Sequence, residues 1–214
     1  MEQTDIWSIN PSTSATFFKT AATVTGGVYP QALVLSNTNP VVAKEGAGYK
    51  VIITSGGDDR TANFTINGAI VGQLTEQGQV PNPNNPEVLA GGNAGAVTSA
   101  YFYSRIDSIT ISKAAAGTVA VGTTGDLALP RCRIKGFYIL GDAATGSLKV
   151  NRFSYTTSAY PTVAVESLLD ISTPAGATLT QFLSLPGQGI LTGQQQNDFA
   201  VVTLDGADYS LFCG

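Results

Sequence analysis

The chain has 214 residues, no histidine, a formal net charge of −4 and only 12% charged residues, against roughly 25% in typical globular domains. Histidine titrates nearest to neutral pH and is the commonest metal ligand, so its absence argues against proton-transfer catalysis and histidine-ligated metals. The negative charge disfavours a nucleic-acid backbone, and no apolar run approaches the roughly 20 residues that span a bilayer. We therefore expect a protein that is not an enzyme, has no cofactor and no metal, and binds neither nucleic acid nor membrane directly.

The N-terminal segment, about residues 1–28, begins with acidic residues and has no apolar signal region, so we expect synthesis in the cytoplasm. It places Trp7, Phe17 and Phe18 among serines and threonines. Two structures fit this pattern: an extended arm ordered by a neighbouring subunit, or an ordinary first strand. The arm alternative makes these three aromatic residues candidate interface residues.

Most of the remaining chain alternates apolar and polar residues with a period of two. In residues 62–67, for example, Ala62, Phe64 and Ile66 fall on one face of a half-buried strand, and Gly68 indicates the next turn. Segment 162–170 fits either a strand or a helix. The expected strands are 49–54, 62–67, 71–76, 97–103, 108–112, 117–122, 131–140, 147–155, 179–183, 189–191, 198–204 and 208–212.

Residues 77–92 interrupt this alternation with a run rich in proline and asparagine. Proline cannot donate to a strand ladder and asparagine favours turns, so we expect an exposed loop. Asn82, Asn84 and Asn85 are its candidate contact residues, and a merely solvated excursion is the alternative. Further on, segments 131–140 and 147–155 predict a hairpin with a turn at 141–146.

Many short strands, frequent turns and no long helical period indicate an all-β fold. We expect two β-sandwich units, immunoglobulin-like or jelly-roll-like, preceded by the N-terminal extended arm. The turn residues at 123–126, followed by Pro130, suggest a boundary between a unit at 1–125 and a unit at 126–214.

The residues that catalysis or metal binding would need form no complete set. Cys132 and Cys213 are too few for a structural zinc site and fit either two buried small residues or a disulfide. Asp58 and Asp59 lie in a Gly-rich hairpin turn without the regular acid spacing of a calcium loop. Serines lack the G-x-S-x-G motif, so the enzymatic arrangements left open are a Ser/Lys site and a pair of carboxylates.

Two features remain as candidate binding surfaces. Arg131, Arg133 and Lys135 alternate, so a strand would present three cations on one face, either to solvent or to acidic groups of a neighbouring subunit. Residues 101–103 are three consecutive aromatics, so each face of that strand carries a ring. A ring on an open face would stack on a partner or a glycan.

The order of motifs between residues 50 and 123 is specific. It comprises VIITSGGD at 51–58, ANFTING at 62–68, QLTE at 73–76, GNAGAVTS at 92–99, YF at 101–102, IDSITIS at 106–112 and VAVGT at 119–123. This series resembles a group of β-rich tailed-bacteriophage virion proteins. The second half is similar to their C-terminal module at RIKG 133–136, GSLKV 146–150, Thr173-Pro174 and LPGQGI 185–190. Residues 77–91 depart from the pattern, which passes more briefly from LTE to the GxNAG segment.

The resemblance implies a non-enzymatic structural component of a tailed-phage virion. We expect a capsid decoration (cement) protein that binds the major capsid protein or other virion proteins, stabilises the particle and self-associates as a homo-oligomer. A neck or tail component is the alternative within the virion. A carbohydrate-binding β-sandwich module of a tail fibre is the rival hypothesis.

Overall fold

The computed structural model describes residues 5–9, 14–37, 47–71, 86–140, 146–154, 163–173, 180–185, 189–192, 198–205 and 208–213. For 5–9, 138–140, 173, 180–184, 204–205 and 208–213 only the backbone is described. Every helix or strand element in these ranges is a strand, which confirms the all-β class. The strands are β1 (Asp5–Ile9), β2 (Ser14–Thr23), β3 (Gln31–Ala32), β4 (Gly48–Ser55), β5 (Asn63–Ile70), β6 (Glu87–Ala90), β7 (Ala96–Ile111), β8 (Thr118–Leu129), β9 (Arg133–Leu140), β10 (Gly146–Phe153), β11 (Glu166–Thr173), β12 (Thr180–Ser184), β13 (Ile190–Leu191), β14 (Phe199–Asp205) and β15 (Asp208–Cys213).

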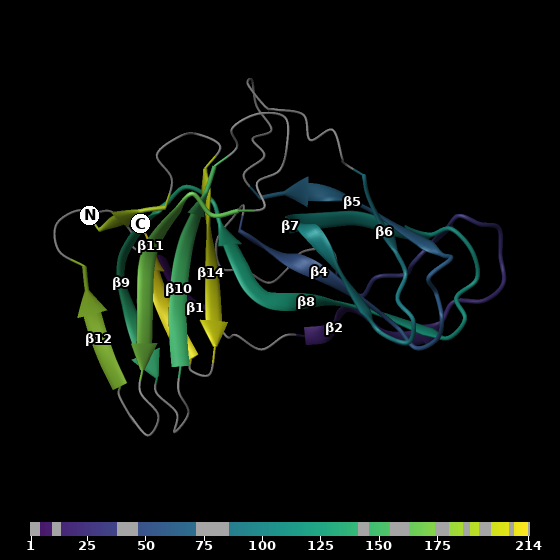
Figure 1. The fold of residues 1–214 in the computed structure, drawn as a ribbon, viewed down its shortest axis with the longest axis horizontal. Helices are drawn as coiled ribbons and strands as arrows, with labels where there is room; N and C mark the ends of the chain where they lie inside the picture. The colour runs from purple at the N-terminus through teal and green to yellow at the C-terminus, as the bar shows by residue number, and fades with distance from the viewer. Residues whose placement is uncertain are drawn as a thin grey trace.

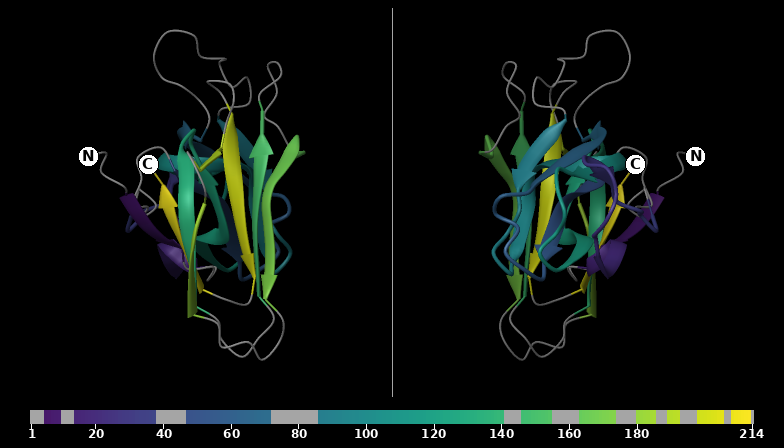
Figure 2. Two further views of the ribbon diagram at one scale, coloured as in Figure 1. Left: turned by 90° about the vertical axis from the view of Figure 1, so that its left-hand side faces the viewer. Right: turned by 90° about the vertical axis from the view of Figure 1, so that its right-hand side faces the viewer.

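The second half of the chain, together with β1, forms two layers. One layer is the five-stranded sheet β1-β15-β9-β12, with β13 also paired to β9. The other is the β11-β10-β14 end of a ten-stranded sheet. The two layers face each other in Figure 2 and enclose one of the two clusters of buried side chains, which includes Leu129, Ile134, Phe137, Val150 and Val202. This arrangement is sandwich-like.

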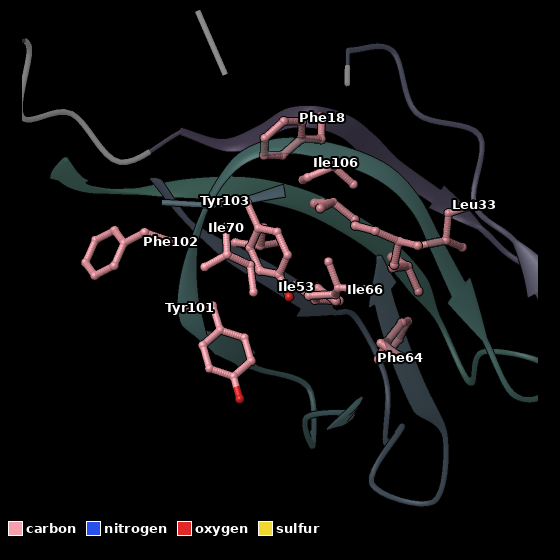
Figure 3. Close-up of a cluster of buried hydrophobic side chains, with 14 of the residues drawn as sticks. Phe18, Leu33, Ile53, Phe64, Ile66, Ile70, Tyr101, Phe102, Tyr103 and Ile106 are labelled. Atoms are coloured by element: carbon pink, nitrogen blue, oxygen red, sulfur yellow. The ribbon is translucent and has the colours of Figure 1, made fainter. Parts of the chain in front are cut away.

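The first half contains the larger core. Its strands continue the ten-stranded sheet in the order β8-β4-β7-β5-β6, with β2 also paired to β8 and β3 to β7. Strand β7 pairs with β4 through residues 96–103 and with β5 through residues 103–111, so it bends the sheet around the core. Figure 3 shows Phe18, Ile53, Phe64 and Ile106 gathered inside this bend.

Strand β8 belongs to both halves. Its first part pairs with β2 and β4, and its last residues pair with β14 (Figure 1). The expected boundary at 125/126 falls inside this strand, at a register shift between β8 and β4 that separates the partners of Thr123 and Leu127. The division into two units stays a prediction, and the structure adds that the two halves share one hydrogen-bonded sheet.

Four expected details differ from the structure. Gly68 is not a turn: it lies within β5 beside a register shift, pressed against the Arg105 carbonyl. Segments 97–103 and 108–112 are one strand, β7. Residues 87–90 of the expected loop form β6, which pairs with β5, whereas 72–85, and with them Asn82, Asn84 and Asn85, lie outside the described residues. Finally, β9 and β10 are not a hairpin, since they belong to different sheets.

The N-terminal segment takes part in both sheets. Strand β1 pairs antiparallel with β15 over five residues, and β2 pairs with β8. Residues 5–9 and 14–23 therefore form ordinary strands, the second of the two alternatives from the sequence. Segment 162–170, which fitted either a strand or a helix, is a strand in the part that belongs to β11, residues 166–170.

Candidate functional site

Of the three alternating cations, Arg133 and Lys135 lie at the start of β9 and Arg131 lies two residues before it. We call Arg131, Arg133 and Lys135 the cationic stripe. Arg131 is exposed and the other two are half-buried, whereas Cys132 and Ile134 between them are buried in the second-half core. No stripe residue forms a salt bridge with another described residue. The other described arginines, Arg60, Arg105 and Arg152, all pair with carboxylates. The stripe is therefore a group of cations that the described part of the chain leaves unneutralised.

The buried Thr192 forms hydrogen bonds with the backbone of Cys132, the residue between Arg131 and Arg133. Its hydroxyl donates to the carbonyl of Cys132 at 2.9 Å, and the Cys132 amide donates to the same hydroxyl oxygen at 2.7 Å. The backbone amide of Thr192 also donates to the Cys132 carbonyl. These bonds fix the backbone from which the cations project. The Cys132 sulfur lies 3.7 Å from the Thr192 hydroxyl, and the Cys213 side chain lies outside the described residues.

The structure gives a different outcome for each of the three aromatic interface candidates. Phe18 is 1% exposed and belongs to the first-half core, so it is not available to a partner. Phe17 is half-buried and packs edge-to-face on Phe18, with ring centroids 5.0 Å apart. Trp7 lies in β1, where only the backbone is described. The correction for Phe18 follows from strand alternation, because consecutive residues of β2 point to opposite faces.

The three consecutive rings at 101–103 are all buried, which removes them as glycan-stacking rings on an open face. Both faces of β7 are covered at this point. Tyr101 and Tyr103 point to one side and Phe102 points away from them, as Figure 3 shows. Phe102 instead packs toward Phe199 of β14, with centroids 6.3 Å apart.

A groove opens beside Phe102, where the two halves meet. We call it the seam groove. Its volume is about 510 Å³, within the roughly 300–1,000 Å³ range of small-molecule sites. It crosses five neighbouring strands of the ten-stranded sheet, β7, β4, β8, β14 and β10. Its lining residues are Lys50, Thr98, Ser99, Ala100, Phe102, Asp126, Asn151, Phe153, Val201 and Thr203.

Aromatic rings form one side of the seam groove. The Lys50 ammonium lies 5.2 Å from the centroid of the Phe102 ring, a cation–π arrangement. Phe199 stands between the two lining rings, tilted against Phe102 and stacked on Phe153 at 5.4 Å with an interplanar angle of 11°. Phe199 is fully buried, so it holds the neighbouring rings of Phe102 and Phe153 in place. The groove therefore has a fixed aromatic side with an ammonium above it.

The buried carboxylate of Glu87 fixes the backbone of the groove at Ala100. Glu87 of β6 is 7% exposed and accepts hydrogen bonds from the Ala100 amide at 2.6 Å and from the Tyr103 hydroxyl at 2.9 Å. Desolvation by burial raises the pKa of Glu87 above its usual value. Next to it, the Ser99 hydroxyl accepts from the Val51 amide and donates to the Tyr101 carbonyl, both at 2.8 Å.

Glu87→Gln tests this burial through the pH dependence of stability. A carboxyl whose folded pKa is raised contributes stability that is fully present below its unfolded pKa, near 4.5, and is lost as pH rises through the folded pKa. We therefore expect wild-type stability, relative to Glu87→Gln, to fall as pH rises above 4.5. Urea unfolding from pH 4 to pH 7 measures the difference.

Asp58→Asn is the control, because its pH dependence lies below the measured range. Hydrogen bonds from Arg60 lower the pKa of Asp58 to about 2, so its contribution is present above pH 3.8 and is lost as pH falls through about 2. The difference between wild type and Asp58→Asn should therefore stay constant from pH 4 to pH 7. The Glu87 assignment is contradicted if the difference between wild type and Glu87→Gln stays constant across the range.

The remaining acidic pair supports a structural turn. Asp58 forms a bidentate contact with Arg60, and the buried Asp59 accepts the Ala116 amide at 2.7 Å. Within the described ranges, no group of three or more Cys, Asp or Glu side chains is placed to hold a metal ion. The same ranges contain no helix with the length and apolar character of a membrane span.

Comparisons with protein-family models, with curated proteins and with solved structures found no match. A function for this chain therefore rests on the sequence motifs and on the two sites described above. The cationic stripe is expected from the sequence, whereas the seam groove is not, because its lining residues come from distant segments.

Proposed function

We propose that this chain is a non-enzymatic structural component of a tailed-phage virion, specifically a capsid decoration protein that binds the capsid surface and stabilises the particle. The observation that carries the proposal is the ordered motif series at 51–123. Its described members form strands β4, β5, β7 and β8 and the turns between them, which together surround the first-half core. A series of separate motifs thus corresponds to one continuous structural module.

The cationic stripe is the proposed contact with the particle. Three cations without salt bridges to described residues, on a backbone fixed by Thr192, favour a partner surface that carries carboxylates. The chain has few other charges to oppose close approach, since only 12% of its residues are charged. Obligate interfaces often bury more than about 2,000 Å², so sister copies are expected to contribute contacts as well.

Replacing Arg131, Arg133 and Lys135 together with serine tests the stripe. We expect a severalfold lower copy number on purified particles, because complementary charge guides association and fixes register. The isolated variant should melt within a few degrees of wild type, since the three side chains lie outside the core. Quantitative mass spectrometry of particles and thermal melting of the free protein provide the two measurements.

Arg60→Ser with Arg105→Ser is the control, because both arginines are exposed and form local pairs with Asp58 and Asp107. Unchanged incorporation of the triple variant would remove the stripe from the interface. Absence of the wild-type chain from purified particles would overturn the virion proposal itself. Density of an intact particle distinguishes a capsid position from a neck or tail position.

A further inference from the structure

We propose that the seam groove is a carbohydrate-binding site for a neutral saccharide of one or two rings. This inference concerns a site separate from the cationic stripe and does not depend on the virion proposal. It is based on open polar side chains, a fixed aromatic side, balanced charge and a rigid frame.

The polar side chains of the groove are open to a ligand. Thr98, Asp126, Asn151 and Thr203 line the groove, and their side chains have no hydrogen-bond partner among the described residues. Together they offer two hydroxyls, an amide and a carboxylate, which is a mixture of donors and acceptors. Sugar hydroxyls each donate and accept, so they match this mixture better than a ligand that only donates or only accepts.

The aromatic side fits the apolar face of a sugar ring. Phe153 is half-buried, and its stacking on the buried Phe199 fixes the orientation of the ring. Val201 adds a buried apolar surface beside it. A ligand with polar edges and an apolar face would therefore find both surfaces within one groove.

The charges of the groove disfavour ionic ligands. Its lining contains one cation, Lys50, and one anion, Asp126. A polyanion such as nucleic acid would meet the Asp126 carboxylate, and a polycation would meet Lys50. A neutral polar ligand meets neither penalty, and the two groups then act as a strong donor and a strong acceptor.

The groove is also rigid. Its side chains project from strands of one continuous sheet, and the wall at Ala100 is held by the buried Glu87. A preformed site on strands costs little ordering entropy on binding. This favours measurable affinity for a small ligand despite the modest volume.

The test measures binding of maltose, lactose and N,N′-diacetylchitobiose to the full chain by saturation-transfer NMR, together with a printed array of defined oligosaccharides. Triglycine is included as a zwitterionic probe, because Lys50 and Asp126 would also complement a free carboxylate and a free ammonium. We expect at least one saccharide to bind. We expect Asn151→Ala and Asp126→Ala each to weaken that binding by about tenfold.

Lys149→Ala is the matched control. Lys149 lies two residues from Asn151 on the same strand, is exposed, pairs with Asp170 and does not line the groove. Its replacement should leave saccharide binding unchanged. The proposal is overturned if no saccharide binds, if triglycine binds instead, or if the groove variants and Lys149→Ala behave alike. Phe153→Leu provides a further check, since loss of the ring should weaken binding while an apolar side chain still packs on Phe199.

Discussion

Replacing Arg152 with methionine is expected to destabilise the protein by about 3–5 kcal/mol. The Arg152 guanidinium lies 3.1 Å from an oxygen of Asp198, whose side chain is 0% exposed, and 2.9 Å from Glu166. The arginine side chain itself is only 15% exposed. Methionine preserves much of the side-chain packing but removes the Arg152 guanidinium from the buried Asp198 carboxylate. Urea unfolding at pH 7 measures the loss.

Lys149→Met is the control for this prediction. Lys149 lies on the same strand, β10, and pairs with Asp170 on β11 at 3.8 Å, but both partners are about half exposed. Solvent-exposed pairs contribute only about 0–1 kcal/mol. Equal losses in the two variants would show that the Arg152–Asp198 pair behaves like a surface pair.

Gly122→Ala is expected to cost about 3 kcal/mol or more, although it adds a single carbon atom. A Cβ at this position would collide with the Ser14 carbonyl and lie 2.6 Å from the Ala15 Cα. These atoms are backbone, so β2 as a whole must move away from β8. That movement would uncover Phe18, which β2 contributes to the core. Thermal melting and urea unfolding would both detect the loss.

Gly95→Ala is the matched control, because the nearest atom to its added Cβ is the Asn93 carbonyl oxygen at 3.6 Å, an ordinary contact. Its effect should stay within about 0.5 kcal/mol. If Gly122→Ala unfolds at the same urea concentration as Gly95→Ala, the close approach of β2 to β8 is not as described.

Strand positions could be predicted from the sequence because alternation is local. Ala62, Phe64 and Ile66 are buried as expected, and the segments 49–54, 198–204 and 208–212 match β4, β14 and β15 closely. Strand partners could not be predicted, because the sequence of one strand does not indicate which other strands it pairs with. The hairpin expected from segments 131–140 and 147–155 shows this, because β9 and β10 lie in different sheets and do not pair with each other.

Residues that are typical of turns gave wrong predictions at the place where the sheet bends. Gly68 and residues 104–107 looked like breaks, but register shifts between β5 and β7 absorb the bend without ending either strand. Burial does not keep a period of two through this part of β7, because the buried residues Tyr103, Ile106 and Ile109 are three residues apart. The register shifts change which face the following residues point to, so the local alternation could not identify one long strand.

The two sites differ in how far they could be predicted from the sequence. The cationic stripe is local, since Arg131, Arg133 and Lys135 are two residues apart. The seam groove joins Lys50, Asp126 and Asn151, which are 25 to 101 residues apart in the chain and become neighbours only through sheet order. A weak signal was present in segment 147–155, where Asn151 and Phe153 share the face opposite the buried Leu148 and Val150.

Strand β8 also determines how the molecule transmits mechanical load. Its twelve residues extend from one core to the other, and neighbouring strands pair with residues 118–123 and 127–129 on either side of a register shift. A pull applied to one half is therefore carried to the other by one extended strand, and the register shift at 124–126 is where neighbouring strands hold that strand least. A force on the stripe should reach the first-half core through β8.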